Sequence, residues 1–228
     1  MTNPYVQSLV DLMTANANPA NAEPMQRYMR DQFPYLGIKT PERRALFKQF
    51  VAKHGLPPVT ELDEAILALW ALPEREYQYL AVGLLDKLQK KLPPQSTQLL
   101  EQLITTKAWW DTVDTLAARI VGTHFQRYPD IQAQFLPIWR QSDNIWLRRT
   151  AILFQLHYKT KTDVDLLFAI IHENLGSTEF FINKAIGWAL REYSKTDRTA
   201  VLTFVNQTDL ASLSRREALK WLKNQNLL

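Results

Sequence analysis

The stretch KAWWDTVD (residues 107–114) is the part of this 228-residue chain from which its fold is most directly predicted. It predicts a loop that leads into a helix. On a helical wheel, one face carries an apolar stripe. Its members are separated by steps of four, three and four residues: Trp109, Val113, Leu116 and Ile120. This spacing is typical of a helix that packs one face against a core.

Trp110 and Asp114 lie one helical turn apart, beside that stripe and not in it. An indole face attracts cations, and a carboxylate attracts them more strongly. The pair is therefore suited to hold a positively charged group. The alternative is structural: Trp110 packs on a neighbouring helix, and Asp114 caps a helix or pairs with an arginine.

Composition excludes several classes of protein. The chain has no cysteine, which rules out disulfides, a thiol nucleophile and zinc–thiolate sites. It has no apolar run long enough to span a membrane, and Met1–Val10 lacks the layout of a signal peptide. These features predict a cytoplasmic protein.

The net charge of +4 is unevenly distributed. Residues 1–114 carry 12 basic and 13 acidic side chains, a net charge of −1, whereas residues 115–228 carry 15 and 10, a net charge of +5. A basic second half indicates an anionic partner, of which nucleic acid is the commonest.

The first part of the chain predicts amphipathic helices. They are expected over residues 5–17, 25–32, 40–54 and 60–72, with a turn over 18–24. Thr40 and Pro41 suit the start of the third helix, and Gly55 suits its end. No alternating run bounded by hairpin signals predicts a strand.

Beyond residue 72 the predicted helices recur. Longer helices are expected to begin near Pro73, Trp109, Asp143, Ser177 and Asp209, at spacings of 36, 34, 34 and 32 residues. Shorter helices are expected between them, over 94–106, 131–141, 164–174 and 198–207. A period of this size predicts stacked helix pairs, and HEAT-like pairs are favoured because the tetratricopeptide consensus is absent. We therefore expect one all-α domain over 1–228, a superhelical solenoid of antiparallel helix pairs with a concave groove, rather than a non-repetitive helical domain.

Polar residues recur at the same period. Asp114, Arg149 and Lys184 are separated by 35 and 35 residues, so they are expected to stack along the groove. Around Lys184, basic and aromatic side chains share one helix face: Phe181, Lys184, Trp188 and Arg191. The last helix continues the basic pattern with Arg215, Arg216, Lys220 and Lys223. Aromatic rings interleaved with Lys and Arg are typical of nucleic-acid contact, although a solvated charged face explains any one helix equally well.

Other signals of catalysis are absent from the sequence. There is no GxGxxG, Walker, HExxH or GxSxG motif. The histidines are scattered and are interpreted as structural or surface residues: His54, His124, His157 and His172. No cofactor or metal is predicted, so any chemistry must come from Trp, Asp, Arg, Lys and Tyr side chains.

Four motifs stand out along the chain: GIKTPERR (37–44), WWDTVD (109–114), WLRR (146–149) and FFINKAIGW (180–188). Together they resemble the AlkD-type DNA alkylation-repair family, and the match covers essentially the whole chain. The resemblance implies a monofunctional DNA glycosylase of HEAT-like repeats that removes N3- and N7-alkylated purines in base excision repair. Its implied partner is double-stranded DNA that contains alkylated purines. We expect a monomer that has no obligate protein partner and does not bind a membrane. It is expected to be associated with the nucleoid when it acts on DNA.

The resemblance also implies the roles of individual residues. Trp110 and Trp188 correspond to two aromatic walls of the family's active site, Asp114 to its catalytic carboxylate and Arg149 to the arginine that holds the DNA backbone nearby. Tyr28 corresponds to a tyrosine beside the site. Further contacts with the DNA backbone are expected from Thr40, Arg43, Arg44, Arg148, Lys184, Arg191 and Arg216.

Three alternatives remain at this stage. A DNA-binding solenoid without catalysis would have no use for Asp114 in its groove. A protein-binding scaffold would use Trp110 and Trp188 as hydrophobic anchors. A bifunctional glycosylase/lyase would need Lys184 as a Schiff-base nucleophile, with a depressed pKa that no sequence feature indicates.

Overall fold

A computed structural model describes residues 3–227 of the chain, and no β-strand occurs within them. The expected all-helical class is thereby confirmed. No helix in this range is long and apolar enough to cross a membrane. The chain forms two compact units, of which the first ends at Pro93 and the second begins at Pro94. The expectation of a single domain with one continuous concave groove stays a prediction.

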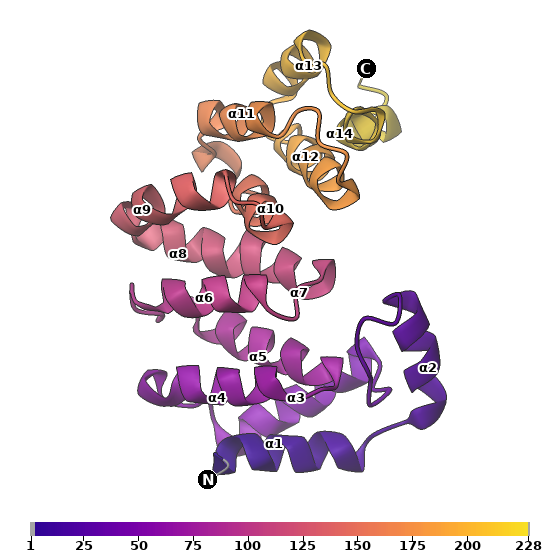
Figure 1. The fold of residues 1–228 in the computed structure, drawn as a ribbon, viewed down its shortest axis with the longest axis vertical. Coiled ribbons are helices and arrows are strands. Elements are labelled where there is room, and N and C mark those ends of the chain that lie inside the picture. The colour runs from indigo at the N-terminus through magenta and orange to yellow at the C-terminus, as the bar shows by residue number, and fades with distance from the viewer. Residues whose placement is uncertain (1–2, 228) are drawn as a thin grey trace. The chain divides into compact units, whose positions relative to one another are not determined.

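The first unit consists of five helices within the described residues (Figure 1). They are α1 (Pro4–Ala15), α2 (Pro19–Tyr28), α3 (Thr40–His54), α4 (Val59–Ala71) and α5 (Arg75–Leu88). α1 packs on α3 and α4, and α4 packs on α5. The apolar faces of these helices bury a core that includes Leu9, Ile66, Leu80 and Leu84, each at most 1% exposed.

The second helix differs from the prediction, because residues 18–24 are not a turn. α2 begins at Pro19, which suits the first position of a helix since its missing N–H needs no partner there. Pro24 lies inside the helix on its exposed side, where water can solvate the carbonyl of Ala20 that lacks an amide donor. The helix ends at Tyr28 because Arg30 and Asp31 adopt φ values of 57° and 56°.

The loop before α3 is held by one buried carboxylate. Glu76, which has no exposed surface, accepts hydrogen bonds from the amides of Leu36, Gly37 and Ile38 at 3.0, 2.9 and 3.0 Å. Gly37 has φ of +88°, and a Cβ atom there would lie 1.9 Å from the carbonyl oxygen of Asn18. The glycine and the loop amides of the GIKTPERR motif therefore fix where α3 begins.

The second unit contains the remaining helices. They are α6 (Ser96–Thr105), α7 (Trp110–Thr115), the π-helix η1 (Leu116–Val121), α8 (Gly122–Arg127), α9 (Pro129–Arg140), α10 (Ile145–Leu153), the short 3₁₀-helix η2 (Lys159–Lys161), α11 (Val164–Glu173), α12 (Phe180–Tyr193), α13 (Arg198–Gln207) and α14 (Ser212–Asn224). Figure 1 shows them as successive pairs. α10 packs on both α7 and α12, and α12 packs on α14.

The predicted period is confirmed along the chain. The helices α5, α7, α10, α12 and α14 begin at residues 75, 110, 145, 180 and 212, at spacings of 35, 35, 35 and 32. The intervening helices α6, α9, α11 and α13 begin at 96, 129, 164 and 198, spaced 33, 35 and 34 residues apart. Within the second unit, the longer helices of successive repeats pack on one another: α7 on α10, α10 on α12 and α12 on α14.

The helix that follows Trp109 contains a local departure from α-helical geometry. Val113, Leu116 and Ile120 have no exposed surface, which confirms these members of the apolar stripe. Trp109, its fourth predicted member, is half-buried and precedes the helix. From Leu116 to Val121, however, the backbone is π-helical and continues directly into α8. The sequence LAARIV is typical of an α-helix and does not predict this widened turn. π-Helical segments occur frequently beside functional sites, and this one starts two residues after Asp114.

The buried imidazole of His124 predicts a pH-dependent stability. Its Nε2 lies 2.9 Å from the Thr97 hydroxyl, and burial lowers the pKa of His124 from 6.5 to about 4. Because the unfolded chain binds a proton below pH 6.5 and the folded chain resists it until about pH 4, the free energy of unfolding falls as the pH falls through this window. We expect a loss of about 2 kcal/mol at pH 5 relative to pH 7.5, measured by urea unfolding.

The matched variants His124→Gln and His157→Gln test this assignment. His157 is exposed. Removal of the titrating group at position 124 should flatten the dependence between pH 7.5 and pH 5, whereas removal at position 157 should leave it unchanged. Equal pH dependence in the wild type and His124→Gln would refute the assignment.

Candidate active site

Asp114 and Arg149 form a bidentate ion pair in the second unit. Each is the fifth residue of its helix, α7 and α10 respectively, so the predicted repeat phase brings them together. Arg149 Nε donates to Asp114 Oδ1 at 2.7 Å, and Arg149 Nη2 donates to Asp114 Oδ2 at 3.0 Å. The Asp114 side chain is 18% exposed and that of Arg149 is 5% exposed. The Asp114 side chain is therefore largely buried but retains some exposed surface.

The same guanidinium also contacts the third helix of this series. Arg149 Nη1 donates to the carbonyl oxygen of Phe181, near the start of α12. One side chain thus links α7, α10 and α12, which belong to three successive repeats. Arg149 was predicted to hold the DNA backbone. The structure gives it three hydrogen bonds within the protein, and these fix the orientation of the Asp114 carboxylate.

The electrostatic environment of Asp114 is a balance between burial and pairing. Burial raises the pKa of the Asp114 carboxyl above 3.8, the hydrogen bonds and positive charge of Arg149 oppose that rise, and the nearby carboxylate of Asp111 adds to it. The net effect is a pKa raised from the ordinary value. A carboxylate that is partly desolvated interacts more strongly with a cation than one in open water.

Trp110 and Trp188 both retain exposed surface. Trp110 is the first residue of α7, one turn before Asp114, and Trp188 lies on α12. Both side chains are half-buried. Since α7 and α12 each pack on α10, the two indoles belong to helices that flank the helix of Arg149. Their roles as aromatic walls stay predictions.

A cluster of aromatic rings supports the N-terminal ends of these helices. The ring of Phe181 lies 5.0 Å from the rings of both Trp109 and Trp146, and the two tryptophans lie 5.8 Å apart. Trp109 is not helical but extended, with φ of −156° and ψ of 159°. Phe181 was expected on the nucleic-acid-binding face with Lys184. Its ring packs in this cluster and its carbonyl accepts from Arg149, and contact of Phe181 with nucleic acid stays a prediction.

Glu217 is a residue of this series that the sequence analysis missed. Its Oε1 lies 3.0 Å from Lys184 Nζ, and its Oε2 accepts a 2.6 Å hydrogen bond from Arg191 Nη1. Burial raises the pKa of Glu217, but the hydrogen bonds from Lys184 and Arg191 outweigh this and lower it. Its position, 33 residues after Lys184, follows the repeat period and could have identified it.

Close packing of α14 on α12 makes this pairing possible. A Cβ atom at Gly187 would lie 2.5 Å from Glu217 Cβ and 2.9 Å from the Ser214 carbonyl oxygen. The absence of a side chain at position 187 lets the two helices approach. Lys184 shares a repeat phase with Asp114 and Arg149, but its ion pair is with Glu217 of the next repeat.

The remaining predicted contacts are distributed over both units. In the second unit, Arg148 Nη1 donates to the Ser142 carbonyl at 2.7 Å, and Arg216 is exposed on α14. In the first unit, Thr40 and Arg44 are exposed and Tyr28 is 74% exposed.

Arg43, the remaining predicted contact in the first unit, is partly covered. Its guanidinium stacks on Tyr79 with 4.1 Å to the ring centroid, and burial lowers the pKa of Arg43. Contact with DNA by any of these residues stays a prediction. Among residues 3–227, no group of three or more His, Asp or Glu side chains is arranged to hold a metal ion.

The fold and this site define an all-α protein of repeated helix pairs with a partly buried acidic centre. A family model described as DNA alkylation repair enzyme matches residues 9–222, and the chain belongs to this family. Membership confirms the resemblance drawn from the four motifs, and it places the protein among enzymes of DNA alkylation repair.

Solved structures agree with this assignment. A predicted DNA alkylation repair enzyme from Enterococcus faecalis is 35% identical, with a TM-score of 0.83 over 90% of this chain and 96% of that chain. The protein smu.31 from Streptococcus mutans UA159 is 12% identical, with a TM-score of 0.62 over 95% of this chain and 98% of that chain, and it supports the fold alone. No curated protein matched the chain.

Proposed function

We propose that the protein is a monofunctional DNA glycosylase that hydrolyses the N-glycosidic bond of cationic N3- and N7-alkylpurines. The observation that carries this proposal is the Asp114 carboxylate, which Arg149 orients through two hydrogen bonds while the Asp114 side chain remains 18% exposed. Trp110, one turn away on the same helix, adds an indole that also retains exposed surface. Membership of a DNA alkylation repair family supports the substrate class.

The chemistry requires little more than electrostatic stabilisation. Alkylation at N3 or N7 gives the purine a positive charge, so the base departs as a neutral molecule with the electron pair of the C1′–N bond and needs no general acid. Positive charge then develops on the deoxyribose. The Asp114 carboxylate stabilises that charge and orients a water molecule, whose oxygen bonds to C1′ and whose proton leaves to the carboxylate or solvent.

Selectivity follows from charge. An indole face stabilises a nearby cation by about 0.5–2 kcal/mol, so Trp110 and Trp188 would favour both the alkylated base and the cationic sugar. An undamaged purine is neutral and gains little from the same site. The substrate is therefore defined by its charge more than by the size of the alkyl group.

The pairing of Lys184 supports hydrolysis without strand cleavage. A lyase would need an amine that attacks C1′ to form a Schiff base. Lys184 Nζ lies 3.0 Å from Glu217 Oε1 and contributes to the contact between α12 and α14. This arrangement favours a structural or DNA-binding role for Lys184 over a nucleophilic one.

The proposal is tested with purified protein, methylated duplex DNA and chromatography of the freed bases. Release of 3-methyladenine and 7-methylguanine, with abasic strands left uncut, is the expected result. DNA binding without base release would instead favour a catalytically silent DNA-binding protein. Absence of both binding and release would favour a protein-binding scaffold.

Glu217 should limit non-specific DNA binding, because it neutralises Lys184 and Arg191 on α12. We expect Glu217→Gln to raise the affinity for undamaged duplex roughly threefold to tenfold at low salt and to steepen its salt dependence, since freed cations release more counterions. Fluorescence anisotropy of a labelled duplex at two salt concentrations measures both effects.

Glu173→Gln is the matched control, because Glu173 also pairs with an arginine, Arg140, and the substitution changes the net charge equally. Equal affinities for Glu217→Gln and Glu173→Gln would show that the local pairing at α12 has no influence on DNA binding.

A further inference from the structure

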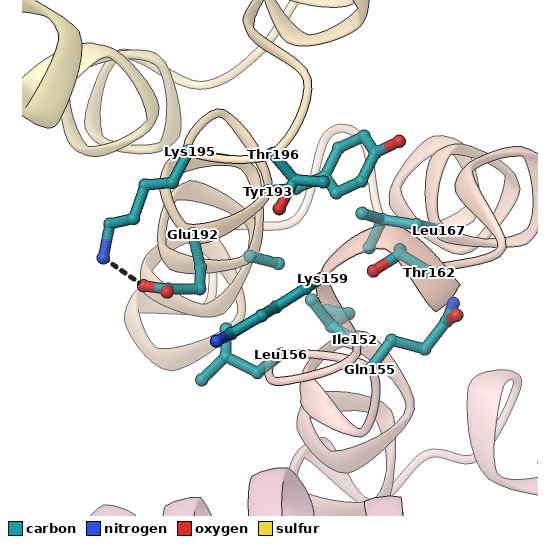
Figure 2. Close-up of a pocket in the computed structure, with 11 residues that line it drawn as sticks. Ile152, Gln155, Leu156, Lys159, Thr162, Leu167, Glu192, Tyr193, Lys195 and Thr196 are labelled. Atoms are coloured by element: carbon teal, nitrogen blue, oxygen red, sulfur yellow. Dashed lines mark hydrogen bonds and ion pairs between the residues drawn. The ribbon is translucent and has the colours of Figure 1, made fainter. Parts of the chain in front are cut away.

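A cavity of about 400 Å³ lies at the C-terminal ends of α10 and α12 in the second unit (Figure 2). Its walls come from the end of α10, the turn that leads to η2, the side of α11, and the end of α12. None of Trp110, Asp114, Arg149 and Trp188 lines it. The volume falls within the range of pockets that hold small molecules, about 300–1,000 Å³.

The floor of this cavity is apolar and its rim is polar. Ile152, Leu156, Leu167 and Ala189 form the floor, and each is between 1% and 7% exposed. Binding of an apolar or aromatic group to this floor is favourable, because it removes the apolar surface of both from water.

The rim carries two ammonium groups and one carboxylate. Lys195 Nζ pairs with Glu192 Oε2 at 2.6 Å, as the dashed line in Figure 2 marks. Among the described residues none forms an ion pair with Lys159, whose side chain also lines the cavity. The rim therefore presents one cation whose charge is not balanced by a neighbouring carboxylate.

The backbone at Lys159 is held in a conformation that side chains disfavour. Lys159 has φ of 54°, in the left-handed region. The segment around it is closed by the buried side chain of Gln155, whose Oε1 accepts from Asp163 N at 2.8 Å and whose Nε2 donates to Asp163 O at 3.1 Å. Strain of this kind concentrates at binding sites, where the surrounding structure maintains it.

We propose that this cavity is a second binding site that takes a small organic anion. Its ligand has an apolar or aromatic body that covers the floor and one phosphate, sulfonate or carboxylate group that pairs with Lys159. A bare inorganic anion would leave the floor exposed to water, and a cation would be repelled by Lys159. The site is independent of the glycosylase chemistry, since it shares no residue with the Asp114 site.

The probe is 8-anilinonaphthalene-1-sulfonate, which combines an aromatic body with one anionic group and becomes fluorescent on binding. Titration of the full chain should reveal binding that Lys159→Gln weakens at least tenfold, the loss expected for one charge-assisted hydrogen bond. Lys161→Gln is the matched control, because Lys161 is exposed in the same η2 helix but does not line the cavity. The affinity of the Lys161→Gln variant for the probe should differ from that of the wild type by less than twofold.

Two further measurements sharpen the test. Lys159→Gly should weaken binding of the probe while leaving the midpoint of urea unfolding equal or higher, because glycine tolerates the positive φ.

Ala189→Leu, which fills the floor, should abolish binding of the probe. Millimolar inorganic phosphate should not displace the probe from the wild type. Equal effects of Lys159→Gln and Lys161→Gln, or complete displacement by phosphate, would overturn the proposal, as would wild-type affinity in folded Ala189→Leu.

Discussion

Asp114→Asn is expected to slow release of 7-methylguanine from methylated duplex DNA by about 10²–10³-fold, the loss typical when one preorganised electrostatic group is removed. The substitution keeps the shape of the side chain and one oxygen that can accept from Arg149. It removes the negative charge that would stabilise the cationic sugar. Single-turnover base release, followed by chromatography, isolates the chemical step from product release.

The matched control for this variant is Asp111→Asn. Asp111 lies on the same helix, and its Oδ1 accepts a hydrogen bond from Thr112 N at 3.0 Å, but it does not pair with Arg149. We expect Asp111→Asn to retain base release within about threefold. A wild-type rate of base release for Asp114→Asn would contradict the proposed mechanism. Equal losses of rate in both variants would show a general effect of the charge on α7.

Replacement of Arg149 by methionine should lower the free energy of unfolding by about 3 kcal/mol, because it leaves a largely buried carboxylate without its partner. It also removes the groups that hold the pKa of Asp114 down, so that pKa should rise further. Since the chemistry needs the ionised carboxylate, the acidic limb of the pH–rate profile should move to higher pH. Urea unfolding and base release between pH 4.5 and pH 8 measure the two effects.

A double substitution separates stability from chemistry. Arg149→Met combined with Asp114→Leu removes both charges, and such replacements of buried ion pairs by apolar residues are often neutral or stabilising. The double variant should therefore regain most of the lost stability while remaining inactive. If Arg149→Met alone kept wild-type stability and an unchanged pH profile, Arg149 would not be the residue that orients Asp114.

Sequence periodicity predicted the repeats well because each helix pair must bury one apolar face against its neighbour. The starts of α11 and α13 fall at Val164 and Arg198, where the pattern placed them. The start of α2 at Pro19 was missed, because proline marks both turns and first helical positions and only packing decides between them.

The candidate site was predictable in part. A shared repeat phase correctly brought Asp114 and Arg149 together, since equivalent positions in stacked helices become neighbours. Lys184, at the same repeat phase, pairs with Glu217 on the following repeat, and its place along the groove stays a prediction. The bond from Arg149 to the Phe181 carbonyl could not be foreseen, because side-chain patterns carry no information on which backbone oxygen accepts a hydrogen bond from a distant side chain.

Arrays of stacked helix pairs can open piecemeal, because each pair touches mainly its two neighbours. The guanidinium that spans three such pairs opposes this behaviour at one place. Opening of α12 at its N-terminal end would withdraw the Phe181 carbonyl from Arg149 and loosen the Asp114 carboxylate two repeats away. Turnover would then report on the integrity of the array, and slow hydrogen exchange at α7 should be lost in step with exchange at α12.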